Sequence, residues 1–133
     1  MDKPKRLLFI SSLDISDNRG KSDGVTKKIL LQIKTFKELD FEVDYIYRLD
    51  GVVFLHKDGE EYKLTYHEGV HYKTMTRTYS ALISFCKDAN YDIIYVRYEG
   101  NNLAMWRFLA QQKKKDKGTK ILAELPTYMG KWD

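Results

Sequence analysis

Apolar runs and amphipathic helical patterns alternate along this chain, and that alternation restricts the fold more than any other feature. Residues 5–12 (KRLLFISS) are continuously apolar at their centre, as in a strand that is buried on both faces. Residues 24–39 follow with apolar positions at helical spacing and lysines between them. Strands that alternate with helices form a parallel sheet with helices on both faces. The sequence therefore predicts an α/β fold of the Rossmann-like type.

The rest of the chain continues this pattern, with one addition. Further strands are predicted at 41–47, 91–98 and 118–126, and further helices at about 71–88 and 101–116. Residues 51–67 hold two β-prone runs around Asp58-Gly59, which is a strong signal for a β-hairpin. We therefore expect one Rossmann-like domain, residues 1–133, with a β-hairpin insertion.

A glycine-containing loop, residues 19–28 (RGKSDGVTKK), joins the first predicted strand to the first predicted helix. Such loops often bind phosphate, because a helix N-terminus offers free N–H groups and glycine lets a ligand approach closely. Ile15 stands where a P-loop requires glycine, and Gly20 and Gly24 alone do not make a dinucleotide fingerprint. Two interpretations remain: Gly24 approaches a phosphate, or it only allows the sharp turn into the helix.

Charged and polar side chains follow two buried strands at their carboxyl ends, where open α/β sheets bind ligands. Arg97, Tyr98 and Glu99 follow one of these strands, and Glu124, Thr127 and Tyr128 lie at the end of the next. This pattern indicates a binding site. An ion pair of Arg97 with Glu124 or Glu99 that only holds the loops together is the alternative, and both interpretations stay open.

The composition excludes several classes of protein. The net charge is only +4, and much of the basic excess lies in residues 113–117 (KKKDK) at an expected helix end, so we predict no nucleic-acid partner. Cys86 is the single cysteine and lies in an apolar helix, which predicts a buried thiol and a reducing compartment. His56, His67 and His71 are too scattered to predict a metal site. No apolar run approaches the ~20 residues that cross a bilayer.

Three segments together resemble the N-terminal half of GT-B glycosyltransferases, family 4 in particular. They are RLLFISS…DGVTKKILLQIKTFKELDFEVDYIY, YDIIYVRYEGNNLAMWRFL and TKILAELPTY, within residues 5–128. The resemblance implies two Rossmann-like domains across a cleft, of which the C-terminal one binds the sugar nucleotide and the N-terminal one supplies the acceptor site. It implies transfer of a hexose-type sugar, with retention, from a nucleotide-sugar donor to a glycan or lipid-linked acceptor, as in polysaccharide biosynthesis. It requires no metal and no other cofactor.

The resemblance also assigns roles by position. The contact with the donor diphosphate falls on Gly24 and Val25, and the catalytic residues stay unassigned. The acceptor-binding side falls on Arg97, Tyr98, Glu99, Asn101, Glu124, Thr127 and Tyr128. The protein is expected in the cytoplasm, either free or peripheral at the inner face of the membrane.

The sequence departs from the family pattern in three respects. Pro126 and Thr127 stand where many members carry a histidine, Asp40 replaces the usual glycine after the first helix, and we expect these 133 residues to form one domain where the family has two. We therefore expect this chain alone to be inactive, and its last strand to be a sheet edge that favours self-association. The alternative is a stand-alone Rossmann-like module that binds a ligand or protein without catalysis; a reading frame that continues into a second α/β domain would favour the enzyme.

Overall fold

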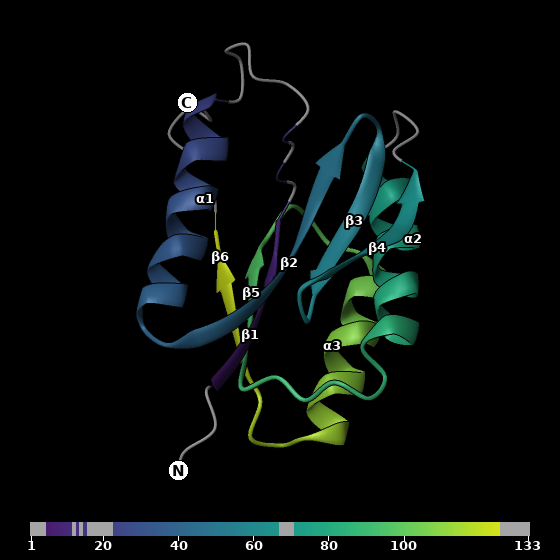
Figure 1. Ribbon diagram of the computed structural model, residues 1–133. Coiled ribbons are helices and arrows are strands. Elements are labelled where there is room, and N and C mark those ends of the chain that lie inside the picture. The colour runs from purple at the N-terminus through teal and green to yellow at the C-terminus, as the bar shows by residue number, and fades with distance from the viewer. Residues whose placement is uncertain (1–4, 12, 14, 16–22, 67–70, 126–133) are drawn as a thin grey trace, which may run out of the picture.

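The computed structural model describes residues 5–11, 13, 15, 23–66 and 71–125, and it is an α/β fold with three helices and one sheet of six strands (Figure 1). The strand order across the sheet is β4-β3-β2-β1-β5-β6. The strands are β1 (Lys5–Ile10), β2 (Phe41–Leu49), β3 (Val52–Lys57), β4 (Glu60–Tyr66), β5 (Ile93–Arg97) and β6 (Lys120–Glu124). The helices are α1 (Asp23–Glu38), α2 (His71–Phe85) and α3 (Leu103–Lys115).

The sheet is mixed, because the predicted β-hairpin adds two antiparallel strands to the predicted parallel sheet. β1, β2, β5 and β6 are parallel, as predicted, whereas β3 and β4 run antiparallel to their neighbours. The cause is a pair of tight turns, at Asp50-Gly51 and at Asp58-Gly59, in which all four residues have positive φ. Two-residue turns of this kind join antiparallel strands. The predicted hairpin around Asp58-Gly59 is therefore confirmed, and it extends the main sheet beyond β2.

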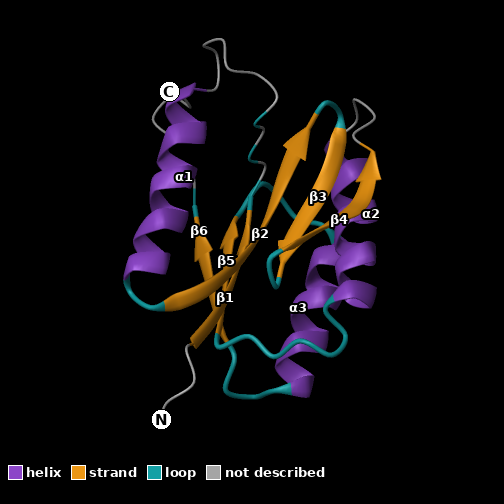
Figure 2. Cartoon of the chain, in the orientation of Figure 1, coloured by secondary structure: helices purple, strands orange, loops and turns teal. Residues whose placement is uncertain are grey.

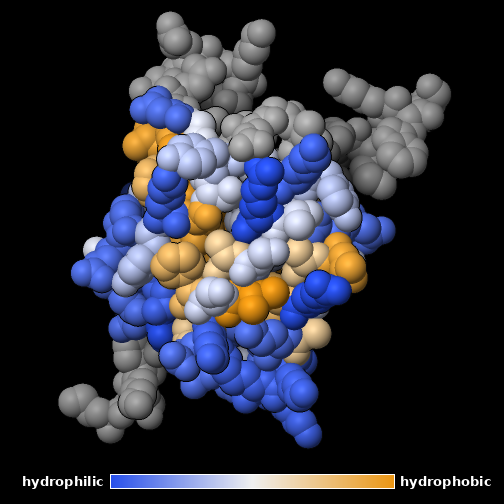
Figure 3. Space-filling model, turned by 90° about the vertical axis from the view of Figure 1, so that its right-hand side faces the viewer, coloured by the Kyte–Doolittle hydropathy of each residue, from blue (hydrophilic) through white to orange (hydrophobic). Residues whose placement is uncertain are grey.

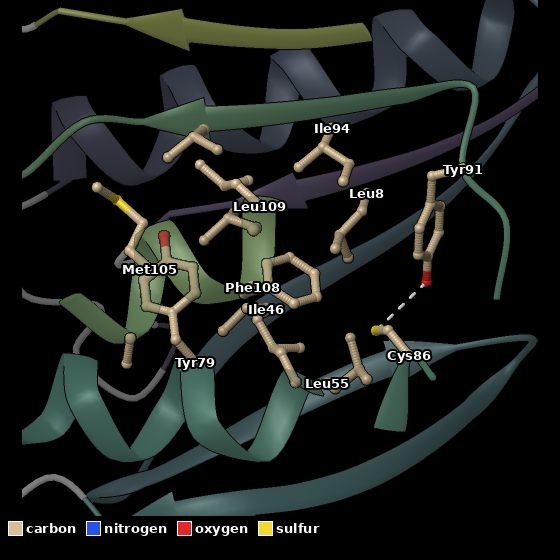
Figure 4. Packing of buried hydrophobic residues seen from close by; sticks show 14 of the residues in the cluster. Leu8, Ile46, Leu55, Tyr79, Cys86, Tyr91, Ile94, Met105, Phe108 and Leu109 are labelled. Atoms are coloured by element: carbon tan, nitrogen blue, oxygen red, sulfur yellow. Dashed lines mark hydrogen bonds between the residues drawn. The ribbon is translucent and has the colours of Figure 1, made fainter. Parts of the chain in front are cut away.

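The helices cover both faces of the sheet, α1 on one face and α2 with α3 on the other (Figure 2). Successive side chains of a strand point to opposite faces. In β1, Leu7 and Phe9 accordingly pack in the cluster that includes Ile29 and Ile33 of α1. Leu8 and Ile10 pack in the larger cluster beneath α2 and α3 (Figure 4). The continuous apolar run at the start of the chain is thus explained by burial on both faces.

Two polar side chains, Asn102 and Lys115, bind backbone groups at the start of α3 and after the end of α2. Asn102 is the N-cap of α3, and its Oδ1 accepts a hydrogen bond from the Met105 N–H at 3.2 Å. Lys115, in the basic cluster at the end of α3, donates from Nζ to the carbonyl oxygens of Cys86 (2.8 Å), Lys87 (3.0 Å) and Ala89. The basic cluster therefore lies in the last turn of α3, as predicted, and Lys115 in addition binds carbonyl oxygens that follow α2.

Cys86 is fully buried directly after α2, which confirms its structural role. Its Sγ lies 3.9 Å from the Tyr91 hydroxyl (Figure 4). Burial raises the pKa of the Cys86 thiol to about 11, so the reactive thiolate is disfavoured at neutral pH.

The side of the molecule that carries β4 and α2 shows a band of apolar side chains flanked by hydrophilic ones (Figure 3). Tyr62 of β4 and Phe85 of α2 contact each other there, with ring centroids 5.2 Å apart. Tyr62 and Leu64 also pack against the larger core cluster. The hairpin is therefore held to the domain through α2 as well as through β2.

Replacing Asp40 by glycine is expected to stabilise the fold by about 0.5 kcal/mol. Asp40 follows α1 with a φ of 68°, where a Cβ atom costs about 1 kcal/mol, and the greater freedom of glycine in the unfolded chain removes part of that gain. Urea unfolding should show a higher midpoint with an unchanged slope. Asp40→Ala keeps the Cβ atom and is the control. If Asp40→Ala is as stable as Asp40→Gly, the Cβ atom does not explain the gain.

Candidate functional site

The carboxyl ends of β1 and β5 form the switch point of the sheet. β2 pairs with one side of β1 and β5 with the other, and the helices that follow β1 and β5 lie on opposite faces. The two connections therefore diverge between β1 and β5. Open α/β sheets bind their ligands outside the strand ends at such a point.

A pocket lies at this switch point, on the face that α2 covers. About 490 Å³ of space lies among its lining residues, a figure that includes open solvent at its mouth. Its walls come from the ends of β1 and β5, from β2 and β3, and from the first half of α2. The lining residues are Ile10, Ser11, Ile46, Arg48, Val53, Thr74, Met75, Thr78, Tyr79, Arg97 and Glu99.

Hydroxyl groups gather on the buried side of the pocket. Thr74 and Thr78 lie one turn apart on α2, and both are buried. Ser11 is 8% exposed, and its buried Oγ has no hydrogen-bond partner within the described structure. A buried polar atom without a partner costs about 1–3 kcal/mol, and a ligand or water that bonds to it removes that cost. The Ser11 hydroxyl is therefore a candidate contact for a polar ligand.

Tyr79 and Glu99 lie close enough for the charge of Glu99 to act on the tyrosine. Burial raises the pKa of the Tyr79 hydroxyl far above its usual value, and the negative charge of Glu99 raises it further. The hydroxyl consequently remains protonated at physiological pH, as a neutral group in the wall of the pocket. The pocket thus combines neutral hydroxyls with the charged side chains of Arg48, Arg97 and Glu99.

Arg97 also belongs to a polar cluster on the α1 face, around Glu124. Glu124 accepts hydrogen bonds from Gln32 Nε2 at 2.9 Å and from the Tyr95 hydroxyl, and its Oε2 lies 3.3 Å from Arg97 Nε. Lys28 Nζ lies 3.8 Å from the same carboxylate. The predicted ion pair of Arg97 with Glu124 is therefore present, and three elements of the fold, α1, β5 and β6, meet at this carboxylate.

The charge state of this cluster follows from its contacts. Burial disfavours the ionised form of Glu124, but hydrogen bonds from Tyr95 and Gln32 and the charges of Arg97 and Lys28 outweigh it and hold the pKa of Glu124 below its usual value. Burial and then the hydrogen bond to Glu124 raise the pKa of Tyr95 to about 12. Arg97 Nη1 remains buried without a hydrogen-bond partner among the described residues. This atom is a second candidate contact for a ligand.

The structure brings together only some of the residues that the sequence selected. Arg97 and Glu99 line the pocket, and Glu124 is held beside Arg97. Tyr98 donates from its hydroxyl to Asn101 Oδ1 at 2.6 Å, and neither residue lines the pocket. Two further sets lie elsewhere: Gly24 and Val25 are in the first turn of α1, on the opposite face, and Thr127 and Tyr128 lie outside the described residues.

Sequence reasoning missed several residues of the site. Ser11 and Arg48 follow or end buried strands, so the strand-end rule that selected Arg97 would have found them if it had been applied to every strand. Thr74 and Thr78 sit in an amphipathic helical pattern, which carries no sign that the helix covers the switch point. Gln32 was likewise hidden in the pattern of the first helix.

Within the described ranges, no group of three or more His, Cys, Asp or Glu side chains is arranged to hold a metal ion. In the same ranges, no helix is both long enough and apolar enough to cross a membrane. No protein-family model matches the chain, and a search of curated proteins finds no match either.

Proposed function

We propose that this chain is the N-terminal, acceptor-binding region of a retaining GT-B glycosyltransferase of the family 4 type. The enzyme transfers a sugar from a nucleotide-sugar donor to a glycan or lipid-linked acceptor. The observation that carries the proposal is the open pocket at the switch point between β1 and β5, whose lining residues include Ser11. The buried Ser11 Oγ has no hydrogen-bond partner among the described residues.

The chemistry of the pocket suits a polyhydroxyl ligand. A sugar presents hydroxyl groups that both donate and accept hydrogen bonds, and C–H faces that pack on apolar side chains. Ser11, Thr74 and Thr78 supply hydroxyls, and Ile10 and Met75 supply apolar wall. Arg97 also lines the pocket, and its guanidinium is held by Glu124 beside it. A few polar groups in a largely apolar concave site are typical of small-molecule recognition.

The start of α1 supports a separate contact with the donor. Gly24 and Val25 lie in the first turn of this helix, where backbone N–H groups have no partner within the helix and favour a negatively charged diphosphate. Stabilisation of a departing diphosphate by such dipoles would assist transfer. This end of α1 follows β1, so it lies at the same edge of the sheet as the pocket but on the other face.

Binding of a simple glycoside tests the proposal. NMR titration of the chain with methyl hexosides should shift the amide signals of Ser11, Thr78 and Glu99. Ser11→Ala should weaken this binding about fivefold, which corresponds to one lost hydrogen bond of about 1 kcal/mol. The variant should fold at least as stably as the wild type, because the substitution removes a buried hydroxyl that has no partner among the residues that the structure describes.

Ser84→Ala is the matched control, because Ser84 lies exposed on α2 and outside the pocket. It should leave glycoside binding unchanged. The assignment of the acceptor site is wrong if no methyl hexoside perturbs any amide of the pocket. Calorimetric titration with UDP-glucose should show no tight binding to this chain alone; micromolar binding would contradict the division of roles between two domains.

A further inference from the structure

Three charged side chains line the pocket at the switch point, and one of them has no counter-charge. The guanidinium of Arg97 is paired with Glu124, and Glu99 acts on Tyr79 through its negative charge. Arg48 lies half-buried near the end of β2, and no acidic side chain pairs with its guanidinium in the part of the chain that the structure describes. A cation that is partly removed from water gains from an anionic partner. The pocket therefore favours an anionic group on its β2 side.

The start of α2 adds partial positive charge to the same pocket. β4 runs parallel to β1, so it ends at the carboxyl edge of the sheet, and α2 begins there (Figure 1). Thr74 and Thr78 bring the first half of this helix into the pocket wall. The first turn of α2 contains Lys73 and no acidic residue. Because a helix N-terminus favours anions, this end of α2 acts in the same direction as Arg48.

The buried hydroxyl of Ser11 requires a hydrogen-bonding ligand as well as an anionic one. Ser11 is 8% exposed, and its Oγ has no partner among the described residues. It follows β1, which lies between β2 and β5. Since neighbouring strands are about 4.8 Å apart, β2 and β5 are about 10 Å apart. An anionic group beside Arg48 is therefore kept away from the carboxylate of Glu99, which accepts hydrogen bonds from neutral hydroxyls of the same ligand.

We propose that the pocket binds an acidic sugar, a hexose ring that carries a carboxylate or a phosphate group. The anionic group pairs with Arg48, a ring hydroxyl bonds to Ser11, and Ile46 and Val53 supply apolar wall. Arginine suits this role because its guanidinium binds carboxylate or phosphate through two parallel hydrogen bonds. The inference rests on the proposed function, since it names the class of acceptor that the same pocket takes. Arg48 is then the residue that distinguishes acidic from neutral acceptors.

NMR titrations with matched ligands test this inference. In the gluco, galacto and manno series, we compare the methyl hexoside, the methyl hexuronide and the methyl hexoside 6-phosphate, which differ only at C6. An acidic ligand should bind about tenfold more tightly than the neutral hexoside of its series, because hydrogen bonds to charged groups are the stronger ones. The tighter of the two acidic ligands identifies the anionic group as carboxylate or phosphate. Added NaCl should weaken binding of the acidic ligand and leave binding of the neutral one unchanged.

Arg48→Gln should remove the preference for the acidic ligand and leave the affinity for the neutral hexoside nearly unchanged. Arg107→Gln is the matched control, because it removes the same charge from an exposed position on α3 that lies outside the pocket. Arg48→Lys keeps the charge without the planar guanidinium and should retain part of the preference. Circular dichroism verifies that each variant is folded.

The outcomes separate this inference from the function on which it rests. Equal affinity for neutral and acidic sugars overturns the inference and leaves the acceptor site in place. An Arg48→Gln variant that keeps the wild-type preference has the same consequence. If no sugar of either kind perturbs the amides of the pocket, the acceptor site and the inference both fail. Inorganic phosphate that binds as tightly as the best acidic sugar would also overturn the inference, because the sugar ring would then contribute nothing.

Discussion

Replacing Asp44 by alanine should lower the free energy of unfolding by about 3 kcal/mol. Asp44 is 4% exposed in β2, and its carboxylate accepts from Arg6 Nη2 at 2.8 Å, from the Tyr91 hydroxyl at 2.7 Å and from the Asp58 N–H at 3.2 Å. Removing one partner of a buried ion pair costs about 3–5 kcal/mol. Here the Tyr91 hydroxyl and the Asp58 N–H lose their acceptor, whereas Arg6 Nη2 keeps a second one, Asp58 Oδ1 at 2.9 Å. The lower end applies here, since a quarter of the Arg6 side chain reaches solvent.

Urea unfolding of Asp44→Ala measures this loss as a lower midpoint. Asp92→Ala is the matched control: its Oδ2 accepts one exposed hydrogen bond, from the Arg6 N–H at 2.8 Å, so the loss should be below about 1 kcal/mol. Asp44→Asn keeps the shape of the side chain and one hydrogen-bond acceptor. Its loss of unfolding free energy should therefore lie between the losses of Asp44→Ala and Asp92→Ala. An Asp44→Ala variant as stable as Asp92→Ala would show that the buried cluster contributes little.

The burial of Asp44 is a feature that the sequence could not predict. In FEVDYIY, alternation suggests that Asp44 and Ile46 share one face with Glu42, so the pattern itself is ambiguous about which face is buried. The structure buries Asp44 because two partners far away in the sequence reach it, Arg6 from β1 and Tyr91 from the turn before β5. Apolar periodicity predicts which segments are strands. It does not predict which polar group a distant strand will neutralise.

The sequence likewise predicts part of the candidate site, namely the residues at the strand ends, and not the residues that α2 contributes. The strand-end rule depends only on strand direction and selected Arg97, Glu99 and Glu124 correctly as residues at the carboxyl edge. The contribution of α2 depends on how the chain crosses the sheet after the hairpin, and β3 and β4 extend the sheet before that crossing. No local pattern encodes the end point of such a connection, so Thr74 and Thr78 could be assigned only from the three-dimensional structure.

Raising the pH above about 10 should destabilise the fold steeply, by about 2 kcal/mol between pH 10 and pH 11 from two buried tyrosines alone. Burial raises the pKa values of Tyr79 and Tyr91 far above the usual value of 10.0. In this range the unfolded chain releases protons that the folded chain retains, so stability is present below pH 10 and falls as the pH rises. Each of these two tyrosines contributes about 1 kcal/mol between pH 10 and pH 11, and the slope approaches about 1.4 kcal/mol per pH unit above pH 11. Tyr47 and Tyr95, with pKa values raised to about 12, act in the same direction.

Phe variants distinguish the contribution of these tyrosines to alkaline unfolding from that of other groups that titrate above pH 10. Tyr79→Phe and Tyr91→Phe should each reduce the slope of unfolding free energy against pH by about 1.4 kcal/mol per unit. The slope is the decisive quantity, because Tyr91→Phe also removes the hydrogen bond to Asp44 and lowers stability at every pH. Tyr72→Phe is the control, since Tyr72 is 56% exposed. If the double variant Tyr79→Phe/Tyr91→Phe keeps the wild-type slope, lysine deprotonation rather than tyrosine burial controls alkaline unfolding.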